Sequence, residues 1–188
     1  MRPSRFLLDY AELYLHDPVG VRRSACASLM GVAMVGRVAD RPKSWERRTL
    51  NQEGLREVDA IRSVHERIWP LRKSPTTGVR SHVLLGQLAT NDIVIRDQTI
   101  STHHCAFVYE LYRIRVVDLD SLNGTRVNRH WLTPYEPATL HDGDELTVGR
   151  VTCCYLSRES LIRLVTSVAT ELRSYQLELH GSDDDAAA

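Results

Sequence analysis

Short runs of β-branched and aromatic residues, separated by turn-forming residues, constrain the fold of this chain more than any other feature. They recur about every 8–12 residues, which is the spacing of an all-β sandwich or barrel. The expected strands are 67–72, 81–86, 93–95, 105–111, 113–119, 145–149 and 151–156, and 126–131 is expected to be a further strand pair or a turn. Polar and glycine residues lie on the turns between them. Because loops on rigid strands are where recognition chemistry is usually found, function is expected on these turns.

Three local features refine the β pattern. The run 67–72 includes Pro70, which has no backbone N–H, so we expect an edge strand there. The dipeptide Asp142-Gly143 predicts a tight turn. Cys153 and Cys154 are adjacent on an expected strand, so one should face the core and the other the outside.

Helices are expected on both sides of the strand region. Apolar residues recur at helical spacing at the start of 2–36, and Pro18 interrupts them. The segment 19–35 continues as helix or is partly strand. A polar loop and a short helix over 55–64 follow. Ser157 can cap a C-terminal helix, whose apolar stripe should dock on the sandwich or on the N-terminal helices.

These elements predict a division of the chain into four parts. The parts are a helical N-terminal extension over 1–60, a β-sandwich over 61–157, a C-terminal helix over 158–180 and a disordered tail over 181–188.

Composition limits the function more loosely. The 188 residues include 24 Lys and Arg and 24 Asp and Glu, so no net charge favours nucleic acid or an anionic membrane. The most apolar run, 25–35, is too short to span a membrane. The four cysteines form no Cys-x-x-Cys pair, and the adjacent His103 and His104 would diverge on a strand, so we expect no metal and no other cofactor. Reduced cysteines fit a cytoplasmic protein.

Three motifs follow one another along the strand region: Gly86-Gln87, Ser101-Thr102-His103-His104 and Asn123-Gly124. Their order resembles the forkhead-associated (FHA) domain, whose pattern is Gly-Arg, then Ser-x-x-His, then Asn-Gly. The resemblance covers roughly residues 66–157. It implies a mainly β fold, a sandwich of two antiparallel sheets, that binds phosphothreonine peptides through loops at one end.

The resemblance also implies a role for each motif residue. Ser101 would hold the phosphate through its hydroxyl, and Thr102 could add a second hydroxyl. Asn123 would hold the peptide backbone, and Gly124 would let that loop turn tightly. His104 would support the loop from inside. Gly86, Thr125 and Asn128 complete the supporting positions.

Gln87 departs from the family pattern, because an uncharged amide stands where the family has a guanidinium. A charge-assisted hydrogen bond contributes about 1.5–3 kcal/mol. Its loss would weaken phosphopeptide binding by about 10- to 100-fold. The candidate replacement cations near the motifs are Arg80, Arg96, His103 and Arg126.

Two interpretations of the function remain open. In the first, the chain is a non-catalytic signalling adaptor that recognises a phosphothreonine partner. In the second, a degenerate FHA domain serves as a phospho-independent scaffold or assembly subunit, with contact to its own N-terminal helices as one option. An enzyme is not expected, since Ser101, with His104 and either Asp118 or Asp120, lacks the Gly-x-Ser-x-Gly turn of a hydrolase nucleophile.

Overall fold

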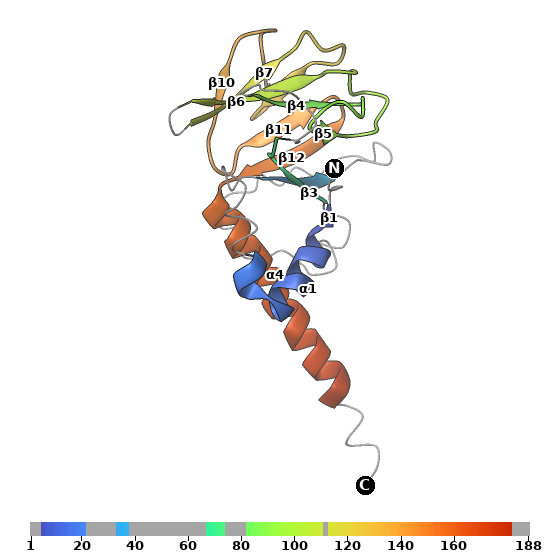
Figure 1. The fold of residues 1–188 in the computed structure, drawn as a ribbon, viewed down its shortest axis with the longest axis vertical. Helices are drawn as coiled ribbons and strands as arrows, with labels where there is room; N and C mark the ends of the chain where they lie inside the picture. Colours follow the sequence, from blue (N-terminus) through green and yellow to red (C-terminus); the bar gives the residue numbers. More distant parts are fainter. Residues whose placement is uncertain (1–4, 22–32, 38–66, 74–81, 111–112, 182–188) are drawn as a thin grey trace.

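The computed structural model describes residues 5–21, 33–37, 67–73, 82–110 and 113–181. Two stacked β-sheets form a sandwich, and helices lie against one of them (Figure 1). The larger sheet comprises β1 (Arg5–Phe6), β2 (Ala33–Arg37), β3 (Arg67–Pro70), β8 (Thr125–Val127), β9 (His130–Trp131), β11 (Glu145–Val148) and β12 (Val151–Leu156). The smaller sheet comprises β4 (His82–Gly86), β5 (Ile93–Val94), β6 (Cys105–Glu110), β7 (Arg113–Asp118) and β10 (Ala138–Leu140). The helices are α1 (Leu7–His16) and α4 (Arg158–Gly181).

The predicted sandwich is confirmed, with helices at both ends of the chain. The strand order is β1-β3-β2-β12-β11-β8-β9 in the larger sheet and β10-β7-β6-β4-β5 in the smaller one. The strand β5 departs from the predicted antiparallel pairing, because it runs parallel to β4. The Asp142-Gly143 turn forms as predicted, with Gly143 at φ 90°. It connects β10 of one sheet to β11 of the other.

The main core lies between the two sheets. Period-2 alternation explains how it forms: in β7, Ile114 and Val116 are buried, while Arg115 and Val117 on the other face are partly exposed. Phe107 on β6 is fully buried in the same core. Fully burying a side chain of this kind contributes about 1.5–3 kcal/mol. This layer keeps the strands rigid beneath the loops that they carry.

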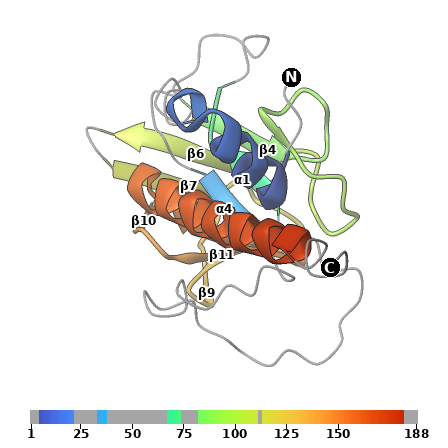
Figure 2. The same cartoon turned by 90° about the horizontal axis from the view of Figure 1, so that it is seen from below.

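A second core forms on the outer face of the larger sheet, where α1 and α4 pack side by side (Figure 2). Cys153 and Cys154 point to opposite faces as predicted, one into the sandwich and one to its outer face, but the outer face is covered by helices. Cys153 belongs to the core between the sheets, and Cys154 is buried under the helices. The C-terminal helix was predicted to dock on the sandwich or on the N-terminal helices, and α4 contacts both β12 and α1.

The predicted helix at the start of 2–36 is confirmed, and for 19–35 the open alternative of partial strand is the one observed at 33–35, while residues 22–32 lie outside the described part of the chain. The helix α1 ends at His16, just before Pro18, as the proline predicts. Residues 33–37 form β2, which is inserted between β12 and β3. The pairing with these distant strands overrides the local helical pattern. The predicted helix over 55–64 lies outside the described residues, and the four-part division of the chain stays a prediction.

The prediction that Pro70 marks an edge strand is also wrong. The strand β3 lies between β1 and β2. However, β1 pairs only with Arg67 and Ile68, and Pro70 is the last residue of the strand. The missing N–H therefore falls beyond the two-residue β1 ladder, and a strand end accommodates proline as well as an edge does.

Candidate functional site

The predicted site residues lie mostly on loops at one end of the sandwich. These are the β4–β5 loop (87–92), the β5–β6 loop (95–104), the β7–β8 loop (119–124) and the β11–β12 turn (149–150). We call them together the loop end. The backbone N–H of Gly149 donates to the carbonyl of Gly124 at 3.3 Å, so residues from distant parts of the sequence meet there.

Gly86 and Gln87 form the start of the β4–β5 loop. A side chain at Gly86 would collide with the backbone carbonyl of Thr102, so only glycine fits. The backbone N–H of Gln87 donates to the carbonyl of Ser101 at 3.0 Å. The side-chain amide of Gln87 donates to the backbone carbonyl of Asp97. Gln87 therefore ties the β5–β6 loop to the end of β4.

Ser101 and His104 fix each other within the β5–β6 loop. The backbone N–H of Ser101 donates to Nδ1 of His104 at 3.0 Å. His104 Nε2 lies 3.1 Å from the carbonyl of Gly124 and donates to it, because Nδ1 is the acceptor. The Ser101 hydroxyl oxygen accepts the backbone N–H of Leu122 at 3.0 Å. The hydroxyl hydrogen of Ser101 is therefore left to donate to a ligand.

His104 is fully buried and neutral. Burial is the largest influence and lowers the pKa of His104 below 6.5, although the Gly124 carbonyl and the nearby Asp118 act in the opposite direction. The neutral ring joins the β5–β6 loop to the β7–β8 loop through its two nitrogens. The supporting role of His104 at a binding site stays a prediction.

Asp118 and Thr125 hold the base of the β7–β8 loop. The Asp118 carboxylate accepts the backbone N–H of Ser121 at 2.8 Å and its hydroxyl at 2.7 Å. It also accepts the hydroxyl of the buried Thr125. Burial raises the pKa of Asp118, but the hydrogen bonds from Thr125 and Ser121 and the nearby His104 outweigh burial and lower it. An ionised Asp118 thus shapes the loop that carries Asn123.

Asn123 lies exposed at the tip of that loop. Its side-chain Nδ2 donates to the backbone carbonyl of Thr99 at 2.8 Å. Gly124 follows with φ 67°, a backbone conformation that favours glycine. The remaining donor and the Oδ1 acceptor of the Asn123 amide are available for a peptide backbone.

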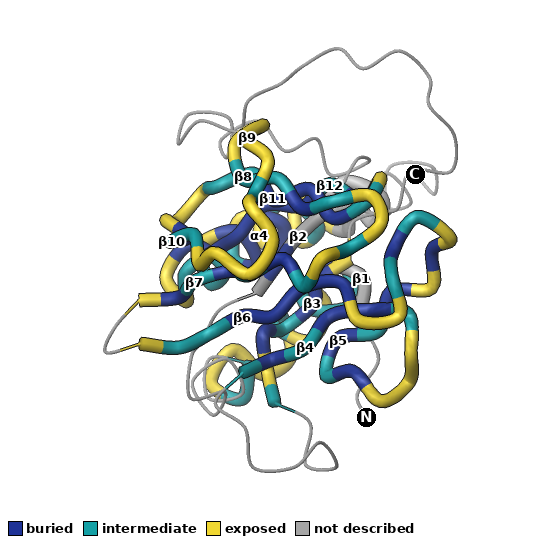
Figure 3. The backbone as a smooth tube through the Cα atoms, turned by 90° about the horizontal axis from the view of Figure 1, so that it is seen from above, coloured by how far each residue is buried: buried dark blue, intermediate teal, exposed yellow. Residues whose placement is uncertain are grey.

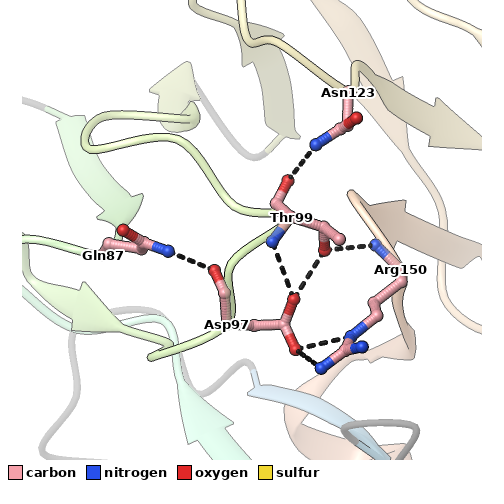
Figure 4. Close-up of polar contacts among 5 residues, drawn as sticks. All are labelled: Gln87, Asp97, Thr99, Asn123 and Arg150. Carbon is pink, nitrogen blue, oxygen red and sulfur yellow. Dashed lines mark hydrogen bonds and ion pairs between the residues drawn. The ribbon is translucent and has the colours of Figure 1, made fainter. Parts of the chain in front are cut away.

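The carboxylate of Asp97 is the centre of the contacts drawn in Figure 4. It is 4% exposed. One oxygen accepts the backbone N–H of Thr99 at 2.9 Å and the Thr99 hydroxyl at 2.6 Å. The other accepts Nε and Nη2 of Arg150 at 2.7 and 2.6 Å. The backbone N–H of Arg150 donates to the Thr99 hydroxyl at 3.0 Å, so the three side chains clamp the β5–β6 loop to the β11–β12 turn.

The ionised form of Asp97 is favoured despite its burial. Burial raises the pKa of Asp97, but the two hydrogen bonds from Thr99 and the charge of Arg150 lower it further than burial raises it, so the pKa lies below 3.8. The same clamp holds the Thr99 carbonyl on which the Asn123 amide rests.

Asn91 connects the β4–β5 loop to residues 102 and 103. Its Nδ2 donates to the carbonyls of Leu88 and Thr102 at 2.9 and 2.7 Å. Both amide hydrogens are thus used, so Oδ1 accepts from Nδ1 of His103 at 2.7 Å. Thr102 and His103 are exposed, and Thr102 presents its side chain next to Ser101.

The comparisons with known proteins agree with this arrangement. The family model described as the FHA domain matches residues 83–149. The glycogen accumulation regulator GarA of Mycobacterium tuberculosis is 36% identical over 94 residues, which are 46% of this chain and 55% of GarA. The oxoglutarate dehydrogenase inhibitor of Corynebacterium jeikeium is 34% identical over 112 residues, 56% of this chain and 69% of that protein. The chain belongs to the FHA domain family.

A solved FHA domain from an Arabidopsis thaliana protein is 32% identical and covers 41% of this chain and 67% of its own, with a TM-score of 0.39. The chain spans about half the length of the GarA proteins that it matches.

The FHA domain brings most of the predicted site residues together but leaves one apart. Gly86, Gln87, Ser101, Thr102, His104, Asn123, Gly124 and Thr125 all lie at the loop end. Asn128 does not, because it sits beyond the far end of β8. There its amide bonds to Asp144 at 2.7 Å and to the backbone of Glu145 at 3.0 Å. With φ 48° at Asn128 and 70° at Arg129, it forms a two-residue hairpin turn.

The candidate replacement cations are spread over the FHA domain. Arg80 lies outside the described residues. His103 is bonded to Asn91, and Arg126 stacks on Trp131 with its guanidinium carbon 4.6 Å from the ring centroid. Arg96 is exposed on the β5–β6 loop.

Sequence reasoning missed Asp97, Thr99 and Arg150. Asp97 and Arg150 are 53 residues apart, and no local pattern relates them. The one available signal was the dipeptide Gly149-Arg150, a glycine at a strand end beside a cation. A side chain at Gly149 would lie 2.7 Å from the Thr99 hydroxyl, so glycine lets the turn approach the loop.

The contacts at Ser101 and His104 do not form a catalytic pair. Both His104 ring nitrogens are bonded to groups other than the Ser101 hydroxyl, so this histidine does not activate the serine. Within the described ranges no cluster of three or more His, Cys, Asp or Glu could hold a metal ion. In the same part of the chain, no helix is long and apolar enough to cross a membrane.

Proposed function

We propose that this chain is a non-catalytic cytoplasmic adaptor whose FHA domain recognises a phosphothreonine-containing segment of a protein partner. The observation that carries the proposal is the placement of Ser101 beside Asn123. The Leu122 N–H holds the Ser101 hydroxyl oxygen at 3.0 Å and leaves its hydrogen to donate. The next residue along, Asn123, presents its amide at the same loop tip.

The relatives support a regulatory role in place of catalysis. GarA bears the name of a glycogen accumulation regulator, and the corynebacterial relatives bear that of an oxoglutarate dehydrogenase inhibitor. A phosphothreonine brings close to two negative charges and three acceptor oxygens. In our proposal, Ser101 and Thr102 donate to these oxygens, and Asn123 holds the peptide backbone.

A second candidate function is favoured by Gln87. Its amide is neutral and is already bonded to the Asp97 carbonyl. The loop end could therefore recognise an unmodified partner as a scaffold. Contact of the loops with the N-terminal region of the chain also stays a prediction.

Calorimetric titration of the 188-residue chain with a degenerate phosphothreonine peptide library, and with the same library unphosphorylated, separates the two functions. We expect the phosphorylated library to bind more tightly, and Ser101→Ala to weaken its binding by about 10-fold. Ser167→Ala, an exposed serine on α4, is the matched control and should bind as the wild type does. Equal binding of both libraries would remove the phosphothreonine proposal in favour of the scaffold.

A further inference from the structure

Large apolar side chains are exposed next to the loop end. Leu122 is 88% exposed, Trp131 64% and Tyr135 65%. All three fall within the 14 residues that run from the β7–β8 loop to the loop before β10. Single exposed apolar residues need no explanation, but an exposed apolar side chain beside a charged group at a loop is a candidate interaction surface.

Trp131 is placed directly against the loop that carries Asn123. A side-chain carbon built on Gly124 would lie 2.6 Å from Cζ3 of Trp131, so the indole ring rests on the glycine backbone. Trp131 is on β9, the outermost strand of the larger sheet, and pairs with Arg126 on β8. Figure 3 shows β9 as exposed at the rim of the sandwich. The ring is thus held against the Gly124 backbone and remains 64% exposed.

The charge beside Trp131 is positive and unpaired. The Arg126 guanidinium carbon lies 4.6 Å from the Trp131 ring centroid. Its Nε is buried without a hydrogen-bond acceptor, and within the described ranges no carboxylate forms an ion pair with Arg126. A buried donor without an acceptor costs about 1–3 kcal/mol. Arg129 adds a second exposed cation in the adjacent hairpin turn.

We propose that the surface formed by Leu122, Arg126, Arg129 and Trp131, here called the Trp131 surface, binds an acidic peptide segment of a protein partner. A carboxylate of the segment pairs with the Arg126 guanidinium, and an apolar side chain next to it covers the open part of the Trp131 ring. Tryptophan and arginine are the residues that most often dominate binding energy at protein interfaces. This binding does not require a phosphate.

An acidic peptide fits the Trp131 surface better than a nucleic acid does. The surface continues from Asn123, which offers groups suited to a peptide backbone. Nucleic-acid binding rests on many phosphate contacts, whereas this chain has equal numbers of acidic and basic residues. Arg126 and Arg129 can pair with one or two carboxylates of a peptide.

NMR of the ¹⁵N-labelled 188-residue chain tests the proposal. The indole N–H signal of Trp131 is assigned by its absence in Trp131→Phe. Two unphosphorylated peptides that share the same leucines are titrated, one with Asp and Glu and one with Lys in their place. We expect the acidic peptide to shift the Trp131 indole signal in a saturable way, with affinity that falls as salt is raised.

Variants define the surface further. Arg126→Gln and Trp131→Ala should each weaken binding of the acidic peptide by about 5-fold or more, measured from backbone amide shifts because Trp131→Ala has no indole signal. Leu177→Ala, which removes another exposed apolar side chain on α4, should not. The proposal would be overturned if both peptides shifted the signal equally or if neither did. It would also be overturned if a single-stranded oligonucleotide, and not the acidic peptide, bound at this surface. Phosphopeptide binding is measured on the same sample. If the acidic peptide does not bind but the phosphopeptide does, only the Trp131 surface proposal fails, and the reverse result removes only the proposed phosphothreonine recognition.

Discussion

The ion pair between Asp97 and Arg150 should stabilise the fold, and the exposure of its two partners sets an upper and a lower bound on the coupling energy. Asp97 is 4% exposed, whereas the Arg150 side chain is 49% exposed. Exposed pairs contribute about 0–1 kcal/mol, and breaking a fully buried pair costs about 3–5 kcal/mol. One buried and one half-exposed partner place the coupling between these values. We expect a coupling energy of about 1–2 kcal/mol.

A double-mutant cycle of Asp97→Asn and Arg150→Met measures this coupling by urea unfolding at neutral pH. The asparagine keeps an acceptor for the Thr99 donors, so the cycle isolates the contact with Arg150. Glu110 and Arg115 serve as the matched control, because their ion pair is 3.3 Å long and both side chains are substantially exposed. The control coupling should stay near zero, at about 0–0.5 kcal/mol.

The pH dependence of the coupling gives a second check. The pKa of Asp97 is lowered in the folded protein, so the associated stability is present above the unfolded value, about 3.9. It is lost only as the pH falls through the still lower folded pKa. The coupling should therefore be the same at pH 7 and pH 5. A coupling indistinguishable from the control, or one that disappears between pH 7 and pH 5, would refute the reasoning.

Three further predictions concern stability, each measured by urea unfolding. Gly86→Ala should cost about 3 kcal/mol or more, because the added methyl group meets the backbone carbonyl of Thr102; a loss under about 1 kcal/mol would show that the loop yields. Arg129→Gly should stabilise the fold by about 0.5–1 kcal/mol, since Arg129 has φ 70° in the hairpin turn, a conformation that favours glycine. An unchanged free energy of unfolding would show that the Arg129 backbone is not strained. His104 has a lowered pKa in the folded protein, so the unfolded chain takes up the proton first. The free energy of unfolding should therefore fall as the pH drops from about 6.5 towards the lower pKa of the folded state. In His104→Gln this dependence should flatten.

Most strands between 82 and 156 could be predicted because their signals are local, whereas β1 and β10 were not predicted. Alternation at Ile114 and Val116, and the Asp142-Gly143 turn, need only neighbouring residues. For 19–35 the sequence left helix and partial strand open, because the pairing of β2 depends on β12, more than a hundred residues further along the chain. Met34 meets Cys153 across 119 residues of sequence, and no local pattern specifies that contact. The burial of Cys154 likewise required knowing that helices cover the outer face.

In the candidate site too, contacts within one loop could be predicted from the sequence, and contacts between distant segments could not. The Ser-x-x-His spacing placed Ser101 and His104 together because it lies within one loop. The contact that supports Asn123 depends on Thr99, which Asp97 and Arg150 hold from two other segments. Asn128 was assigned as a supporting position on the resemblance to the FHA domain. The three residues of β8 carry it to the opposite end of that strand, where it closes a hairpin.

The position of Gln87 explains how the family arginine could be replaced without loss of the loop structure. The Gln87 amide donates to the Asp97 carbonyl, and this contact needs a donor but no charge. An arginine at 87 can make the same contact through one N–H of its guanidinium and still has others to offer a phosphate. Gln87→Arg therefore adds charge at the loop end while it keeps the support of the β5–β6 loop. A rise in phosphopeptide affinity of about 10- to 100-fold in that variant would measure the missing charge alone. Unchanged affinity would mean that the guanidinium stays on the Asp97 carbonyl, and that the loop support is the role of this position.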